Sequence, residues 1–229
     1  MKKSLMISVL AVELLSACGG GGGGGGSSGP VASTNSFNLQ SGYNAIVQNG
    51  WSKTFSISGT CTGSISITRA AASTSTTFES VSALSSAETL TGSFTNCTPA
   101  SLAVTETLYY NSSNYTQLGY SVLSGNYAVF ATPPTIPTSV RVGDTAVIGT
   151  MNIYTNSSKT TSAGHQDLSY VVTADTASTA FITLISRIYD ASSNLTSTEQ
   201  DKYRIDASNQ LTPVSLDILY SNGTHLIGN

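Results

Sequence analysis

The chain has 229 residues, of which only 9% are charged, against about 25% in an ordinary cytosolic domain. Its formal net charge is −3 at pH 7, and its few lysines and arginines are scattered along the chain. These values exclude the basic patch that a nucleic-acid partner needs. The many Thr, Val, Ile and Tyr residues are typical of a β-rich exported protein.

Residues 1–17 have the organisation of a secretory signal. Lys2 and Lys3 form a basic start, an apolar run follows from residue 5 to residue 15, and small residues precede the expected cleavage point. The apolar run is shorter than the roughly 20 residues that span a bilayer. The next feature, Leu15-Ser16-Ala17-Cys18, resembles the lipobox of bacterial lipoproteins.

This resemblance implies that Cys18 is lipidated, that the chain is cut before it, and that the new amine is acylated. Three acyl chains exceed the roughly two membrane signals that stable anchoring requires. With Gly19 rather than Asp after the cysteine, the resemblance implies the outer membrane of a Gram-negative bacterium, in its periplasmic or its surface-facing leaflet. Glu13 departs from the pattern, and the alternative is a plain secretory signal followed by a free cysteine.

Residues 18–36 are expected to form the lipidated cysteine and a flexible tether. Eight glycines follow Cys18, and glycine has the largest backbone entropy to lose and no side chain to bury. A coil of this composition has an end-to-end distance of about 25 Å. Similar glycine runs follow the lipobox of uncharacterised lipoproteins of Gram-negative bacteria.

The segment 37–132 is predicted to be a β module. Apolar and polar residues alternate, as in Phe55 to Gly59, and Asn-, Ser- and Gly-rich turns separate the alternating stretches. A short helix is conceivable only at Ser82 to Thr91. Cys61 and Cys97 form an even pair in a compartment that permits disulfides, which predicts a bridge between distant strands.

The proline-rich segment 133–137 is predicted to be a linker between two modules. Three prolines in five residues cannot lie in a central strand, because each lacks an amide donor and restricts its predecessor. The alternative is a long crossover within one continuous sheet.

The segment 138–229 is predicted to be an antiparallel β-meander. The near-repeat of Asp190 to Thr196 and Asp206 to Thr212, with a third turn about fifteen residues later, indicates consecutive hairpins. The expected fold is all-β and antiparallel, a sandwich or meander of about 12 to 14 strands with one disulfide. The strands expected in this half are Val147–Tyr154, Leu168–Ala174, Phe181–Tyr189, Gln200–Ile205, Val214–Tyr220 and His225–Ile227.

Three local sequence patterns resemble functional motifs but do not meet the structural requirements of those motifs. Gly59 to Gly63 has the spacing of a nucleophile elbow around Cys61, but a strand rather than a helix follows it. Asp190 to Asp201 lacks the glycine and the glutamate of a calcium loop. His165 and His225 lie sixty residues apart, and two imidazoles do not make a zinc site. We therefore expect no metal and no cofactor.

Five tyrosines are a candidate binding patch, since tyrosine has a rigid apolar face with a polar tip. If they alternate between the faces of a sheet, they are core instead. The five are Tyr109, Tyr110, Tyr115, Tyr120 and Tyr127.

The expected function is that of a lipid-anchored envelope protein that binds a protein or glycan partner or has a structural role, without catalysis. The alternative is a lipid-anchored hydrolase of envelope polymers, with Glu79, Glu88 and Glu106 as candidate acids. Glycosidases work with two carboxylates about 5 to 9.5 Å apart. Two of these acids converging in a concave pocket would favour the enzyme, whereas a flat aromatic patch would favour binding.

Overall fold

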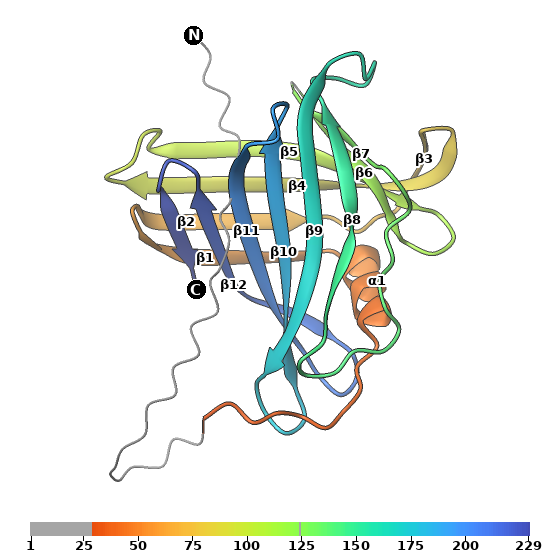
Figure 1. Ribbon diagram of the computed structural model, residues 1–229, viewed down its shortest axis with the longest axis vertical. Helices are drawn as coiled ribbons and strands as arrows, with labels where there is room; N and C mark the ends of the chain where they lie inside the picture. Colours follow the sequence, from red (N-terminus) through yellow and green to blue (C-terminus); the bar gives the residue numbers. More distant parts are fainter. Residues whose placement is uncertain (1–28, 124) are drawn as a thin grey trace.

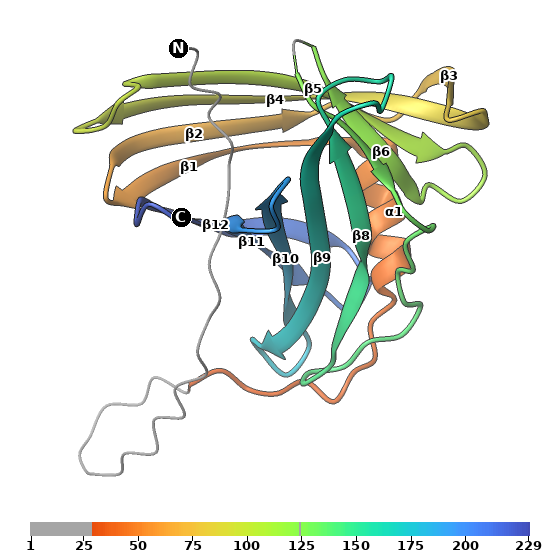
Figure 2. The same cartoon turned by 45° about the horizontal axis from the view of Figure 1, so that its top comes forward.

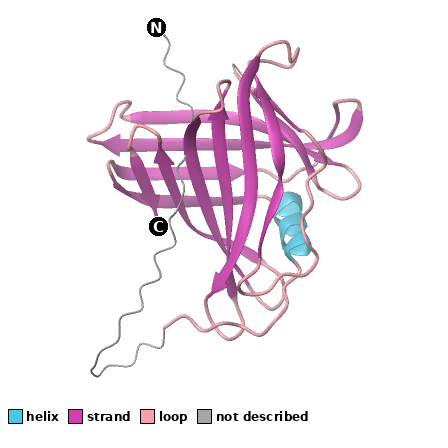
Figure 3. Ribbon diagram, viewed as in Figure 1, coloured by secondary structure: helices cyan, strands magenta, loops and turns pink. Residues whose placement is uncertain are grey.

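The computed structural model describes residues 29–123 and 125–229, so the predicted lipobox and Cys18 lie outside the described residues (Figure 1). Most of the described residues lie in strands, and one stretch of them forms a helix, α1 (Leu39–Asn49) (Figure 3). The first strands are β1 (Trp51–Gly59), β2 (Thr62–Arg69), β3 (Thr74–Phe78), β4 (Val81–Thr95), β5 (Ser101–Asn111), β6 (Gln117–Val122) and β7 (Tyr127–Phe130). The others are β8 (Thr145–Tyr154), β9 (Ser162–Ala174), β10 (Ala180–Asp190), β11 (Leu195–Ile205), β12 (Leu211–Tyr220) and β13 (His225–Gly228).

These strands form one antiparallel sheet that closes on itself. From β4 to β13 each strand pairs with the next along the chain, β13 pairs with β1, and β1 pairs with β2. The β2–β4 pairing then closes a ring of twelve strands. β3 lies outside the ring and pairs with the first residues of β4, beyond the end of β2. The predicted all-β antiparallel meander is confirmed, and its form is a barrel.

The alternation of buried and exposed side chains along each strand explains why the sheet closes around a core. On β1, Phe55 and Ile57 face inward and are almost fully buried, whereas Thr54, Ser56 and Ser58 are exposed to solvent. The outward hydroxyls pair across strands, as Thr54 does with Ser66 at 2.7 Å. Such cross-strand pairs contribute about 0.2–1 kcal/mol each, so both faces of these strands support the same register.

The barrel is not circular in cross-section. β1, β2, β4 and β5 run together as one layer, and β8, β9 and β10 cross it at a steep angle (Figure 2). Six hairpin turns, at residues 59–62, 95–101, 122–127, 154–162, 190–195 and 220–225, lie at the same end of the antiparallel ring, which we call the hairpin end. The opposite end, where α1 packs, is called the helix end.

The proline-rich segment 133–137 lies in the loop that joins β7 to β8, two neighbouring strands of the same sheet. β7 and β8 pair from Tyr127 with Tyr154 to Phe130 with Met151, so the strands before and after the prolines are direct neighbours. Prolines cannot donate to a ladder, and the chain therefore loops out between the two paired strands. The described residues form one continuous sheet, the alternative to two separate modules.

α1 closes the helix end, and sequence analysis did not predict it. The Asn38 side chain caps the helix by accepting the Ser41 N–H at 2.9 Å. Leu39 packs against the ends of β9 to β12, and Val47 packs against the end of β5. Gly42 allows close approach, because a Cβ there would lie 2.4 Å from a backbone carbonyl oxygen.

Ser82 to Thr91, where a short helix was conceivable from the sequence, lie instead in the strand β4. Both edges of β4 are occupied, by β5 on one side and by β3 and then β2 on the other. Strand pairing along both edges outweighs the weak local preference of this Ser- and Ala-rich stretch for a helix.

The tether predicted to reach residue 36 ends earlier. The Val31 N–H donates to the Asp175 carbonyl at 3.2 Å, and the Ser33 hydroxyl donates to the Ala177 carbonyl at 2.9 Å. These contacts hold residues 31–36 against the β9–β10 turn. The chain therefore joins the barrel at its helix end.

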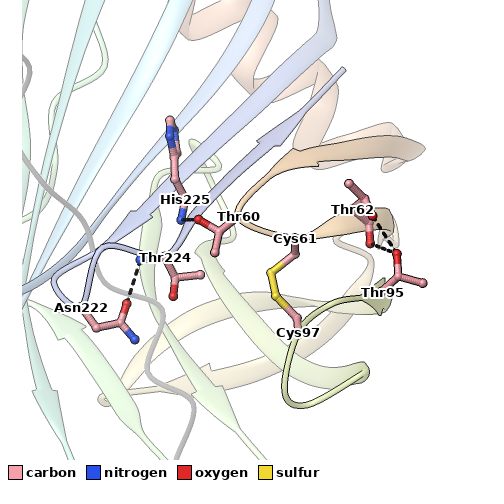
Figure 4. Close-up of a disulfide and its surroundings, with 8 residues drawn as sticks. All are labelled: Thr60, Cys61, Thr62, Thr95, Cys97, Asn222, Thr224 and His225. Carbon is pink, nitrogen blue, oxygen red and sulfur yellow. Dashed lines mark hydrogen bonds between the residues drawn. A yellow bond between two sulfur atoms is a disulfide. The ribbon is translucent and has the colours of Figure 1, made fainter.

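The Cys61–Cys97 disulfide is confirmed and lies at the seam where the ring closes (Figure 4). The two Cα atoms are 5.6 Å apart, and beside them Thr62 pairs with Thr95 through their hydroxyls at 2.7 Å. The bridge links the β1–β2 turn to the loop after β4, so it holds together strands that are not consecutive in the chain.

Candidate functional site

The barrel encloses a cavity of about 460 Å³, which we call the lumen. Its lining begins at Leu39 and Tyr43 of α1 and extends to Gly125 and Asn126 in the β6–β7 hairpin. Gly125 is exposed to solvent, so the lining runs from the helix end to the rim of the hairpin end. A volume of this size lies within the range of about 300–1,000 Å³ that ligand pockets have.

One side of the lumen carries a row of charged residues from three adjacent strands. Arg69 of β2 is the register partner of Glu88 on β4, and Glu88 is the register partner of Glu106 on β5. Direct partners have Cβ atoms about 4.5–5.5 Å apart. The Arg69 Nε donates to Glu88 Oε2 at 2.5 Å, and both side chains keep limited exposure, 19% and 15%.

Two further carboxylates come from β11. Glu199 and Asp201 alternate with outward-facing residues and share the inward face with Tyr203, which is buried. All three line the lumen. The charge of Glu88 acts on both acids, which places the β11 acids and the charged row around the same space.

The lumen is therefore strongly acidic. Arg69 pairs with Glu88, whereas no ion pair or side-chain hydrogen bond between described residues involves Glu106, Glu199 or Asp201. Burial, with the charge of Glu88, raises the pKa of Glu106 to about 7 and that of Asp201 to about 7. Burial also raises the pKa of Glu199 well above its ordinary range, with Asp201 and Glu88 adding to the effect. Uncompensated buried carboxylates favour a proton or another positive charge.

Polar atoms without partners lie close to this cluster. Tyr110 is fully buried at the helix end, and its hydroxyl has no hydrogen-bond partner among the described residues. Burial raises the pKa of Tyr110 to about 12, and the charges of Arg69, Glu88 and Glu106 also act on it. Gln166 lines the lumen, and its Oε1 atom has no partner among the described residues, although its Nε2 donates to Ser186 at 2.7 Å.

Much of the remaining lining is apolar. Besides Gln166 and Ser186, strands β7 to β10 contribute aliphatic and aromatic side chains. They are Phe130, Ile148, Met151, Ile153, Ala163, Leu168, Ile182, Leu184 and Ile188. A cavity with one charged side and one apolar side has the lining of an amphipathic ligand site.

Of the three candidate acids, the structure brings two together. Glu88 and Glu106 meet in the lumen, as described above. Glu79 lies outside the barrel, where it pairs with Lys159 and accepts a hydrogen bond from the Tyr127 hydroxyl at 2.7 Å. The Lys159 hydrogen bond lowers the pKa of Glu79, so this residue is a surface ion-pair partner.

The five tyrosines divide between different surroundings. Tyr120 faces the lumen, while Tyr110 and Tyr115 belong to the core at the helix end. Tyr109 and Tyr127 lie on the outer face and pack on Phe78, with ring centroids 4.2 Å and 5.3 Å from it. Alternation along the strands separates neighbouring tyrosines, so the five do not form a single surface patch.

The histidines are surface residues with local partners. His165 stacks on Tyr189 with centroids 4.5 Å apart, and His225 Nε2 lies 2.9 Å from Asp217 Oδ1. In the described part of the chain, no three His, Cys, Asp or Glu side chains are placed to hold a metal ion. Asp190 instead accepts the N–H groups of Ser192 and Asn194 in its predicted hairpin turn.

Most of the polar side of the lumen was not predicted from the sequence. Arg69, Glu199, Asp201, Tyr203 and the α1 residue Tyr43 were not among the candidates. For β11 a usable signal exists: Glu199 and Asp201 have the same parity as Tyr203 and Ile205, two core-like residues. Charged residues on the apolar parity of a strand indicate acids that point into a barrel.

Comparison with known proteins assigns the chain to no family, because no family model, no curated protein and no solved structure matches it. Among the described residues, no helix is both long and apolar enough to cross a membrane.

Proposed function

We propose that this chain is a lipid-anchored protein of the cell envelope that binds an amphipathic small molecule in its lumen, without catalysis. The observation that carries the proposal is the two-sided lining of a cavity of about 460 Å³, charged along β2, β4, β5 and β11 and apolar along β7 to β10. Ligand pockets are mostly apolar, with a few polar groups that fix orientation.

The place where the chain enters the barrel supports an anchored orientation. Val31 and Ser33 attach at the helix end, about a dozen residues after Cys18. A glycine-rich coil of that length spans about 20 Å. With Cys18 in the outer membrane, the helix end is the end of the barrel that the tether holds within about 20 Å of the lipid.

Binding in the lumen is tested with the neutral dye N-phenyl-1-naphthylamine, whose fluorescence rises in apolar surroundings. Ala163 lines the lumen, so Ala163→Phe fills part of it and should abolish the fluorescence increase. The matched control is Ala103→Phe, at an exposed position on β5, which should leave the increase unchanged. Equal binding by both variants, or no binding by the unsubstituted chain, would contradict the proposal.

A second candidate function is hydrolysis of an envelope polymer. The specific observation in its favour is that Glu106, with its raised pKa, is the register partner of Glu88, which is paired with Arg69. Two carboxyl groups in different environments are the arrangement of a general acid and a nucleophile or base. Release of reducing ends from peptidoglycan or polysaccharide that Glu88→Gln and Glu106→Gln both abolish would establish this candidate over binding.

A protein or glycan partner on the outer face is a further prediction. Tyr109 and Tyr127 are its outer-face candidates, and crosslinking in intact cells followed by identification of the captured partner tests it. Loss of a captured partner in a Tyr109→Ala variant would support the prediction.

A further inference from the structure

We propose that the lumen selects an organic cation with an aliphatic tail, whose ammonium group is bound by at least two of the three acids Glu106, Glu199 and Asp201. This inference rests on the proposed function of the lumen and adds the chemical class of the ligand. It assigns the charged side of the cavity to the ammonium group and the apolar side to the tail.

The charge balance of the lumen favours a cation. Four carboxylates line it, and Arg69 is paired with one of them, Glu88. The remaining three have no cationic partner among the described residues. An ammonium group has three N–H donors and a positive charge, so it can satisfy carboxylates that approach from different strands. An anionic ligand would add repulsion to a site that is already acidic.

A second observation points to the same place. Gln166 lines the lumen, and its Oε1 atom is buried without a hydrogen-bond partner among the described residues. Its Nε2 atom donates to Ser186, the register partner of Glu199, so the unpartnered oxygen lies on the same wall as the β11 acids. Buried polar atoms are nearly always hydrogen-bonded in native proteins, so an unpartnered acceptor that lines a cavity indicates a missing donor. A bound ammonium group supplies such a donor.

The cation is organic rather than metallic. Within residues 29–123 and 125–229, the acids do not converge closely enough for three of them to hold a metal ion. The space beside them is lined by Met151, Leu168 and Ile188, among other apolar side chains, which a bare ion would leave in contact with water. An alkyl tail covers that surface and gains about 0.8 kcal/mol per buried methylene.

Binding of a cation to these acids is linked to their protons. Burial favours the protonated carboxyls near neutral pH, so the ammonium group must displace protons as it binds. Affinity for the cation should therefore rise from pH 5 to pH 8. The titratable and charged groups that face the acids from the elements around them are Tyr43 on α1, Lys53 on β1, Arg69 on β2, Glu88 on β4, Tyr110 on β5, Tyr120 on β6, Tyr203 on β11 and Tyr220 on β12.

Of these groups, Lys53 does not supply the missing positive charge. Its ammonium donates to the carbonyl oxygens of Pro213 and Val214, at 3.0 Å and 2.6 Å. The tyrosines keep their protons at these pH values, because burial raises the pKa of Tyr43, Tyr120 and Tyr203.

The test is calorimetric titration with three probes that share one tail: octylamine, 1-octanol and octanoate. The protein is the full-length chain carrying Cys18→Ala, so that no acyl chain and no detergent compete. At pH 8, octylamine should bind roughly tenfold more tightly than 1-octanol, as one charge-assisted interaction provides, and octanoate should bind most weakly. Titrations in two buffers of different ionisation enthalpy should detect proton release with octylamine alone.

The double variant Glu199→Gln/Asp201→Asn should lower the affinity for octylamine to that for 1-octanol. Its affinity for 1-octanol should stay within about twofold, which also shows that the lumen is folded. If the double variant does not fold, Glu106→Gln alone should reduce the preference for the amine. Equal binding of the three probes, or an unchanged amine affinity in the variants, would overturn the cation inference and leave the lumen a site for apolar tails. Failure of all three probes and of the neutral dye would overturn the proposed function itself.

Discussion

Replacement of Glu106 by glutamine should make the barrel more stable at alkaline pH and leave it unchanged at acidic pH. Glu106 is a lumen carboxyl whose pKa is raised from 4.5 to about 7, by burial first and then by the charge of Glu88. Each pKa unit corresponds to about 1.4 kcal/mol, so this shift is equivalent to about 3 kcal/mol of unfolding free energy.

The sign follows from the direction of the shift. A carboxyl whose folded-state pKa is raised binds its proton more tightly in the folded state than in the unfolded state. Its stabilising contribution is complete below pH 4.5 and is lost as the pH rises through about 7. Glutamine has nearly the same shape and never ionises, so Glu106→Gln should match the parent chain at about pH 4 and exceed it by up to about 3 kcal/mol at about pH 8.

Urea unfolding followed by circular dichroism at the two pH values measures this difference. The matched control is Glu79→Gln, because Glu79 has a lowered pKa from its hydrogen bond with Lys159. The control should show a small loss of stability at pH 8, the opposite sign. If Glu106→Gln were equal to or less stable than the parent at pH 8, the acidic, uncompensated lumen would be the wrong description.

Three further variants test other parts of the account. The pair Cys61→Ala/Cys97→Ala removes a bridge with a sequence separation of 36 and should lower the free energy of unfolding by about 4 kcal/mol, while reductant should affect the parent but not the double variant. Phe78→Ala removes a side chain that is 3% exposed and stacked on Tyr109, and should cost about 3 kcal/mol in urea unfolding; a cost near zero would contradict the outer aromatic packing. Cys18→Ala should release the protein from the membrane fraction, and mass spectrometry of the parent's N-terminus should find an acylated Cys18; an unmodified N-terminus would refute the anchor.

The sequence was sufficient to predict the fold class because its signals are local. Alternation at Phe55 and Ile57 and the turn residues around Asp190 and Asp206 each depend on a few neighbouring residues. Ring closure could not be predicted in this way. The pairing of β2 with β4 and of β1 with β13 joins segments that are distant in sequence, and only the Cys61–Cys97 pair indicated one of these contacts.

The candidate site was predicted only in part, because strand pairing, and not the local sequence, brings its residues together. Glu88 and Glu106 were among the candidate acids, but their pairing depends on the register of β4 with β5. Arg69 joins them through β2, and Glu199 reaches the same lumen from β11. α1 was missed because Gly42, which lowers helix propensity, is required where the helix crosses a backbone carbonyl.

A crystal structure of the Cys18→Ala chain with octylamine at pH 8 tests the central claim most directly. The account predicts one molecule in the lumen, with its nitrogen within hydrogen-bonding distance, about 3 Å, of at least two of Glu106, Glu199 and Asp201, and its tail against Met151 and Leu168. An octylamine molecule bound on the outer face, or one in the lumen with its nitrogen turned toward the hairpin end and away from the three acids, would contradict it.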